Sequence, residues 1–170
     1  MSQNAEIFTL TYGSMVRQLV QDLEDVHEVN RELERIGHSI GLRLADEYVA
    51  RSGTTRCSDR RVAMDRAARV GFKLFLSVQG SVAGWSADGA ECSLVLEDNP
   101  LVDFVELPEA LAHLKYSNVL PGVLRGAFEA VGTDVECTLV KEPTQGDDVT
   151  EIRVRFLSSD PEAYPFRDDD

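Results

Sequence analysis

The sequence predicts an α+β protein in which one four-stranded antiparallel sheet packs with one face against helices. In some stretches, apolar residues recur every three or four positions, as in helices with one buried face. In other stretches, which are short and grouped in pairs, apolar and polar residues alternate as in half-buried strands. In chain order the pattern predicts three helices, a hairpin, a further helix and a second hairpin.

The first helix is expected over 14–24, where an apolar stripe is formed by Met15, Val16, Leu19, Val20 and Leu23. The polar stretch 25–30 is expected to be a connection. The second helix is the clearest, because six apolar residues recur at helical spacing: Val29, Leu33, Ile36, Ile40, Leu44 and Tyr48. On another row of this helix, Gly37, Gly41 and Ala45 leave room for close helix packing, although each interior glycine costs about 1 kcal/mol of helix propensity.

A third helix is expected over 58–78, after the break at 52–55. It carries a row of small residues, Ala63, Ala67 and Gly71, with Ala68 beside the row and the larger Phe75 nearby. Such a row most often marks the packing of one helix on another. A narrow apolar tunnel has the same requirement, because it needs small side chains on one wall and large apolar ones opposite.

The segment 80–90 is expected to be a loop, and a hairpin is predicted over 94–108. Asp98, Asn99 and Pro100 favour a turn, and Pro108 ends the pairing because it has no amide proton to donate. The fourth helix is expected over 115–131. The second hairpin joins alternating stretches at 135–139 and 152–156 through a turn at 143–148. The prediction is therefore a single domain over 1–157, followed by an acidic, solvated tail over 158–170.

The composition excludes several classes of function. The 170 residues carry a formal net charge of −13, which argues against nucleic acid as a partner and against unaided binding to anionic lipid. No apolar run approaches the ~20 residues of a membrane helix, and the N-terminus does not resemble a signal peptide, so a cytosolic or nuclear protein is expected. The three cysteines, Cys57, Cys92 and Cys137, form no Cys-x-x-Cys pair, and the histidines lack zinc-helix spacing. We therefore expect no metal site.

No catalytic constellation is expected either. The segment 84–89 resembles a serine-hydrolase elbow only faintly, since its second glycine is one position late. Asp103 and Glu106 fall on the predicted hairpin, where solvent-facing or interface roles are commoner than acid–base chemistry.

A series of motifs follows in order along the chain: IFTLTYG at 7–13, IGHSIGLRL at 36–44, RCSD at 56–59, NPLVDFVELP at 99–108, YSN at 116–118, GVLRGA at 122–127 and VTEIR at 149–153. Each motif is weak alone, but the ordered set is specific. It resembles the Bet-three family, which is subunit three of the transport protein particle (TRAPP) complex. The resemblance covers about 7–156 and implies an α/β-plait fold.

In this family the cysteine of the Arg-Cys-x-Asp motif carries a palmitoyl thioester, and Cys57 matches that position. The flanking residues agree with a reactive thiol, because the positive charge of Arg56 and a helix start capped by Ser58 or Asp59 both stabilise a thiolate. From position alone, an unreactive thiol beneath the loop remains the alternative.

Family members hold the acyl chain in a tunnel inside the protein, which the resemblance places along Ala63, Ala67, Ala68, Gly71 and Phe75. From Ala63 to Gly71 a helix rises about 12 Å, a large fraction of a long acyl chain. At ~0.8 kcal/mol per buried methylene, a palmitoyl group could add on the order of 10 kcal/mol to stability. This helix departs from the family in being unusually basic, through Arg60, Arg61, Arg66 and Arg69.

The resemblance further implies a scaffold that assembles with other TRAPP subunits, in a complex that tethers vesicles between endoplasmic reticulum and Golgi. Such a complex promotes nucleotide exchange on a Rab-type GTPase, an activity that the chain alone would lack. A cytoplasmic protein, peripheral at the cis-Golgi and endoplasmic reticulum, is therefore expected. One alternative is a small-ligand-binding sensor domain of similar architecture. Another, a lipid-handling enzyme with Cys57 as acyl acceptor, lacks a paired base.

A homodimer is expected when the chain is expressed alone, and a heteromer in the cell. The apolar stripe of the first helix, Met15 to Leu23, wraps around more than half of that helix. The second helix has its own close-packing row, and one sheet face has no layer above it. Because one core cannot cover all of these surfaces, part of them is expected to meet another subunit.

Overall fold

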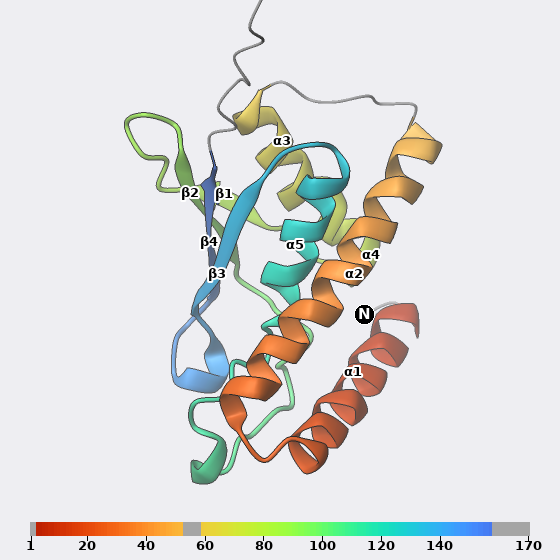
Figure 1. The fold of residues 1–170 in the computed structure, drawn as a ribbon, viewed down its shortest axis with the longest axis vertical. Helices are drawn as coiled ribbons and strands as arrows, with labels where there is room; N and C mark the ends of the chain where they lie inside the picture. Colours follow the sequence, from red (N-terminus) through yellow and green to blue (C-terminus); the bar gives the residue numbers. More distant parts are fainter. Residues whose placement is uncertain (1–2, 53–58, 158–170) are drawn as a thin grey trace, which may run out of the picture.

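The computed structural model describes residues 3–52 and 59–157. Figure 1 shows a layered arrangement, with the sheet on one side, α5 (Val119–Ala130) beside it, α2 (Val26–Ser52) across α5, and α1 (Gln3–Asp22) outermost. A third helical segment consists of α3 (Arg60–Arg66), the π-helical turn Ala67–Gly71 and α4 (Phe72–Leu76). Short 3-10 turns occur at Glu109–Leu111 and Pro143–Gln145.

The sheet contains β1 (Ser81–Ala83), β2 (Glu91–Leu96), β3 (Val135–Lys141) and β4 (Thr150–Phe156), in the antiparallel order β1-β2-β4-β3. The strands alternate in burial, so that Val154 and its cross-strand neighbours Cys92 and Cys137 all lie in the core. The predicted α+β class, the four-stranded antiparallel sheet and the order of helices and strands are confirmed.

The outer face of the sheet is polar and needs no covering layer. On this face the Arg153 guanidinium lies 3.4 Å from a Glu91 carboxylate oxygen, and the Lys141 ammonium lies 2.8 Å from that of Glu151. Charged side chains keep their solvation there, so this face, although it has no layer above it, gives no reason to expect a second subunit.

The small-residue row of α2 packs inside the chain. A Cβ placed on Gly41 would lie 2.1 Å from the Val123 carbonyl oxygen of α5, and one on Gly126 would lie 2.1 Å from the carbonyl oxygen of His38. The backbones of α2 and α5 therefore touch, which only glycine allows at these positions. The expectation that this row awaits another subunit was wrong.

The apolar stripe of α1 also serves the core. Val16 is buried, and the other four predicted interface residues, Met15, Leu19, Val20 and Leu23, are half-buried against the core. Tyr12 anchors the helix further, since its hydroxyl donates a hydrogen bond to the carbonyl oxygen of Tyr116. The large apolar side chains that α1 does expose lie nearer its start, where Ile7 is 63% exposed and Leu10 is 73% exposed.

The first predicted hairpin was wrong. Strand β2 pairs with β1, which lies in the segment expected to be a loop, whereas 99–104 forms turns. The reason is the burial of Asn99, whose Nδ2 donates hydrogen bonds to Ser117 Oγ at 2.9 Å and Thr150 Oγ1 at 3.0 Å. The chain is thus turned inward after β2, and the residues that follow, 99–108, form no strand.

Several predicted boundaries also shift. Helix α1 begins well before residue 14, α2 begins at Val26 within the expected connection, and α5 begins at Val119 rather than near 115. Asp25 explains the second shift, because its Oδ1 accepts the His27 N–H at 2.9 Å at the start of α2. The predicted tail lies outside the described residues.

Candidate functional site

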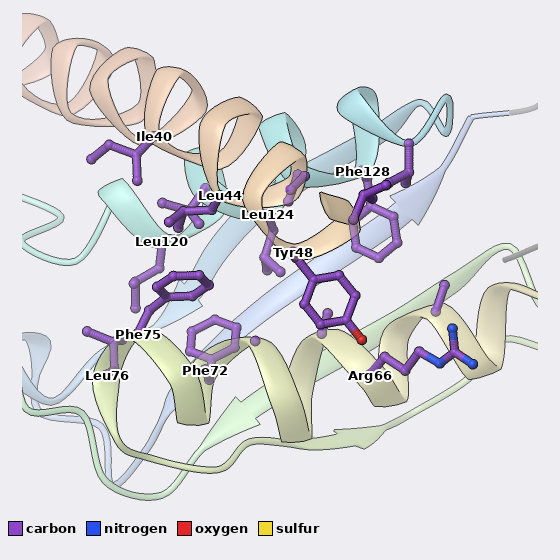
Figure 2. A pocket seen from close by; sticks show the side chains of 18 of the residues that line it. Ile40, Leu44, Tyr48, Arg66, Phe72, Phe75, Leu76, Leu120, Leu124 and Phe128 are labelled. Atoms are coloured by element: carbon purple, nitrogen blue, oxygen red, sulfur yellow. The ribbon is translucent and has the colours of Figure 1, made fainter. Parts of the chain in front are cut away.

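A cavity of about 410 Å³ lies between α2, α5 and the α3–α4 segment (Figure 2). Its size falls within the usual range of small-molecule sites. Nineteen residues line it, nearly all of them apolar: Phe8, Ile40, Leu44, Ala45, Tyr48, Val49, Ala63, Arg66, Ala67, Gly71, Phe72, Phe75, Leu76, Leu120, Val123, Leu124, Ala127, Phe128 and Val131. Such a wall suits an apolar ligand of considerable length.

The small residues of the third helical segment lie on one wall of this cavity. Ala63, Ala67 and Gly71 line it, together with Phe75. Ala68 is not among the lining residues, because successive residues are about 100° apart around a helix. It is fully buried in the core instead, and its carbonyl oxygen accepts the Gly80 N–H at 2.9 Å.

The wall includes the π-helical turn Ala67–Gly71, a form of helix that is frequent at functional sites. A Cβ on Gly71 would meet no atom within 4 Å, so open space lies in front of this residue. The turn thus presents two of the smallest side chains of the chain, Ala67 and Gly71, to the cavity.

The start of α3 is only partly described. Cys57, Arg56 and Ser58 lie outside the described residues, so their predicted roles stay predictions. Asp59 is the N-cap, because its Oδ1 accepts the N–H groups of Arg61 at 2.8 Å and Val62 at 3.4 Å. Of the two candidate caps, Asp59 therefore fills this position.

The unusual basic residues of this segment have separate roles. The Arg60 guanidinium lies 5.3 Å from the centre of the Phe156 ring, and that of Arg61 lies 4.9 Å from the centre of a ring of Trp85. These cation–π contacts fasten α3 to the edge of the core. Arg69 Nε donates a hydrogen bond to Asp65 at 2.7 Å, whereas Arg66 lines the cavity.

Neither of the cysteines in the described part of the chain is a nucleophile. Burial raises the pKa of the Cys92 thiol to about 11 and that of Cys137 to about 12, so both stay protonated at neutral pH. Over the described ranges 3–52 and 59–157, no cluster of three His, Cys, Asp or Glu side chains could hold a metal ion. The same ranges contain no helix that is long and apolar enough to cross a membrane.

Sequence reasoning missed most of the cavity. The opposite walls come from α2 and α5, through residues such as Leu44, Tyr48, Leu124 and Phe128. The apolar stripes of α2 and α5 are evident in the sequence. However, a stripe that faces a cavity has the same residue spacing as one that faces a filled core. A possible signal was the size contrast between these residues and the small ones on the third helical segment.

Comparisons with known proteins connect this cavity to a family. A model of the family described as "Transport protein particle (TRAPP) component" matches residues 8–155. Trafficking protein particle complex subunit 3 of Dictyostelium discoideum is 51% identical over 152 residues, which are 89% of this chain and 82% of that protein.

Solved structures agree. The crystal structure of a trafficking protein particle complex subunit 3 from Naegleria fowleri, covalently bound to palmitic acid, superposes with a TM-score of 0.86 at 45% identity. The match covers 91% of this chain and 96% of that one. The phenol-responsive sensory domain of the transcription activator PoxR superposes with a TM-score of 0.57 at 14% identity, over 87% of this chain and 74% of that one, which shows a shared fold alone. The chain belongs to the TRAPP component family, and within it to the subunit 3 (Bet-three) group.

Proposed function

We propose that this chain is a scaffold subunit of a TRAPP complex that tethers vesicles in transport between endoplasmic reticulum and Golgi. Within that complex it contributes to nucleotide exchange on a Rab-type GTPase, and by itself it catalyses no reaction. It works in the cytoplasm, peripherally at the cis-Golgi and endoplasmic reticulum. Membership of the family supports this proposal, as does the relation to trafficking complex subunits along most of the chain.

The second part of the proposal is a palmitoyl or similar fatty acyl thioester on Cys57 whose chain fills the cavity. The apolar cavity carries this part of the proposal, because about 410 Å³ of apolar space is far more than the small voids that a well-packed core leaves. Cys57 precedes the first residue of α3 by only three positions, and Ala63 of α3 lines the cavity. The relative from Naegleria fowleri is itself covalently bound to palmitic acid.

A buried acyl chain would act on stability. At ~0.8 kcal/mol per methylene, a palmitoyl chain that fills the cavity contributes on the order of 10 kcal/mol, comparable with the whole stability of a domain. The chain end would also contact Phe8, which is the residue of α1 that lines the cavity. Acylation therefore supports the fold, and membrane attachment is left to the assembled complex.

The third part of the proposal is assembly through α1. Ile7, Phe8 and Leu10 expose apolar side chains within one turn of this helix, and exposed apolar patches usually mark contacts between proteins. We expect this surface to form a homodimer when the chain is expressed alone and to meet other TRAPP subunits in the cell. Leu19 and Val20 pack against the core, so substitutions there would disturb the fold as well as an interface.

Affinity purification of the tagged chain from eukaryotic cells tests this function. A scaffold should co-purify with a fixed set of TRAPP subunits identified by mass spectrometry, and Leu10→Asp should reduce the set more than the distant surface variant Thr138→Asp. Recovery of the chain without TRAPP subunits, carrying an exchangeable small ligand, would instead favour a small-ligand-binding sensor domain.

A further inference from the structure

We propose that the cavity also binds a free long-chain fatty acid without a covalent bond, and that Arg66 and Tyr48 hold its carboxylate at one end. The inference concerns the cavity of the proposed function but does not require the thioester. It goes beyond that function, because it assigns the cavity a second, exchangeable ligand that reaches it without reaction at a cysteine.

The observation behind this proposal is the position of the one charged residue in the cavity wall. Arg66 is the only ionisable cation among the nineteen lining residues. Figure 2 shows the side chains of Arg66 and Tyr48 at one end of the cavity, and those of Phe75 and Leu76 at the other. The cavity thus has a long apolar body and one cationic end, the pattern that suits an anionic amphiphile.

The direction of the helices places the two polar groups together. From Ile40 to Tyr48 helix α2 rises about 12 Å, and from Arg66 to Leu76 the third helical segment rises about 15 Å. The two run in opposite directions along the cavity, so that Tyr48 faces the region of Arg66 while Ile40 faces that of Phe75 (Figure 2). A fatty acid with its carboxylate at Arg66 would point its tail toward Phe75.

The thioester does not account for Arg66, because a thioester carries no charge. The neighbouring arginines are engaged, as Arg60 and Arg61 lie over aromatic rings and Arg69 pairs with Asp65. Within 3–52 and 59–157, by contrast, Arg66 has no ion pair. A carboxylate would give this guanidinium the charged partner that its geometry favours, with the Tyr48 hydroxyl as a second donor.

The competing explanation is that Arg66 only covers the cavity with its aliphatic stem, while its guanidinium stays in water. The two explanations differ in one measurable respect. If Arg66 only covers the cavity, a fatty acid and its methyl ester should bind with equal affinity. If Arg66 binds a carboxylate, the acid should bind more tightly than the ester. Because Arg66 is exposed, we expect a preference of about 3- to 10-fold, as for a charge-assisted hydrogen bond near the surface.

The experiment uses the full chain with Cys57→Ser, which cannot form the thioester, after removal of bound lipid. Palmitate and methyl palmitate compete with an environment-sensitive dye that reports on the cavity, at pH 8. We expect palmitate to bind about 3- to 10-fold more tightly than its ester, and Arg66→Met to remove this preference. Arg69→Met, one turn away and outside the wall, is the matched control and should keep it.

Three results would overturn the inference: no binding of palmitate, equal binding of acid and ester, or a preference that survives Arg66→Met in protein with unchanged circular dichroism. If Arg66→Met fails to fold, Arg66→Gln, which also removes the charge, takes its place. Intact mass of the unmodified chain reports the thioester separately. An absent thioester with palmitate bound to the Cys57→Ser chain would refute the proposed acylation alone, and the reverse result would refute this inference alone.

Discussion

Replacing Gly71 by leucine should exclude a fatty acyl chain from the cavity while leaving the fold standing. Gly71 lies in the cavity wall with right-handed helical backbone angles, φ −59° and ψ −57°. A Cβ there would meet nothing within 4 Å, so the new side chain enters open space without strain. The branched side chain then occupies the volume through which an acyl chain would pass.

The expected magnitudes follow from this geometry. The usual overpacking cost of ~1–3 kcal/mol does not arise in an empty cavity, and removal of an interior glycine gains about 0.5–1 kcal/mol of helix propensity. Without an acyl group, the variant should therefore be at least as stable as the parent. As purified from eukaryotic cells it should be less stable, because the parent alone keeps a buried chain worth on the order of 10 kcal/mol.

The assay combines intact mass, which gives the acylated fraction, with thermal unfolding before and after hydroxylamine treatment. Gly71→Ala is the matched control, since one methyl group in that open space leaves room for the acyl chain. Ala68→Leu provides the contrast, because this fully buried side chain faces the core and should cost ~1–3 kcal/mol without lowering acylation. If the Gly71→Leu protein is acylated as fully as the parent, the acyl chain does not run along this wall.

Three further predictions follow from the fold. Gly41→Ala should lower the free energy of unfolding by about 1–3 kcal/mol in denaturant titration, because its Cβ would lie 2.1 Å from the Val123 carbonyl oxygen; an unchanged midpoint would contradict the close helix contact. Burial raises the pKa of the Glu142 carboxyl, so the folded state holds this proton more tightly than the unfolded chain. The contribution of this carboxyl to stability is therefore present below about pH 4.5 and is lost as the pH rises through the raised pKa. The free energy of unfolding of the parent, relative to that of Glu142→Gln, should fall from pH 4 to 7. A difference between the two proteins that does not change with pH would refute this. Finally, Leu10→Asp should convert a homodimer into a monomer in sedimentation at micromolar concentration, and a parent that is already monomeric would refute the dimer.

The parts of the fold that depend on local pattern could be predicted from the sequence. The spacing of apolar residues in α2 and α5 and the alternation in β3 and β4 reflect burial of one face, which each residue's own neighbours reveal. The small-residue row of α2 also predicted a close approach correctly. Its partner was predicted wrongly, since nothing local distinguishes α5 of the same chain from a helix of another subunit.

The turns that replace the first predicted hairpin could not be predicted, because they depend on contacts with residues far along the chain. Asn99 looks like an ordinary turn residue, but its amide is bound by Ser117 and Thr150 in the core. Glu142 acts similarly, accepting the backbone N–H groups of Tyr116 at 3.0 Å and Ser117 at 2.5 Å from within the core. Such long-range polar contacts leave no periodic signal. They leave Phe104, which the pattern placed in a half-buried strand, 91% exposed.

Of the cavity, only the wall formed by the third helical segment was predicted from the sequence. Ala63, Ala67 and Gly71 stand out because small residues at a spacing of four are unusual in a helix that also carries Phe72 and Phe75. The volume enclosed between that wall, α2 and α5 depends on how the three segments cross, which no single stretch of sequence determines. The position of Arg66 in the wall has the same origin, since its neighbours Arg60, Arg61 and Arg69 have the same chemistry but point elsewhere.

Intact mass of the chain purified from eukaryotic cells, with and without hydroxylamine, tests most directly whether the cavity holds a fatty acyl chain bound to Cys57. The protein should exceed the mass of its polypeptide by one fatty acyl group, lose the excess on treatment with hydroxylamine, and lack it altogether in the Cys57→Ser variant. The mass of the bare polypeptide in several independent preparations, without hydroxylamine, would contradict the account.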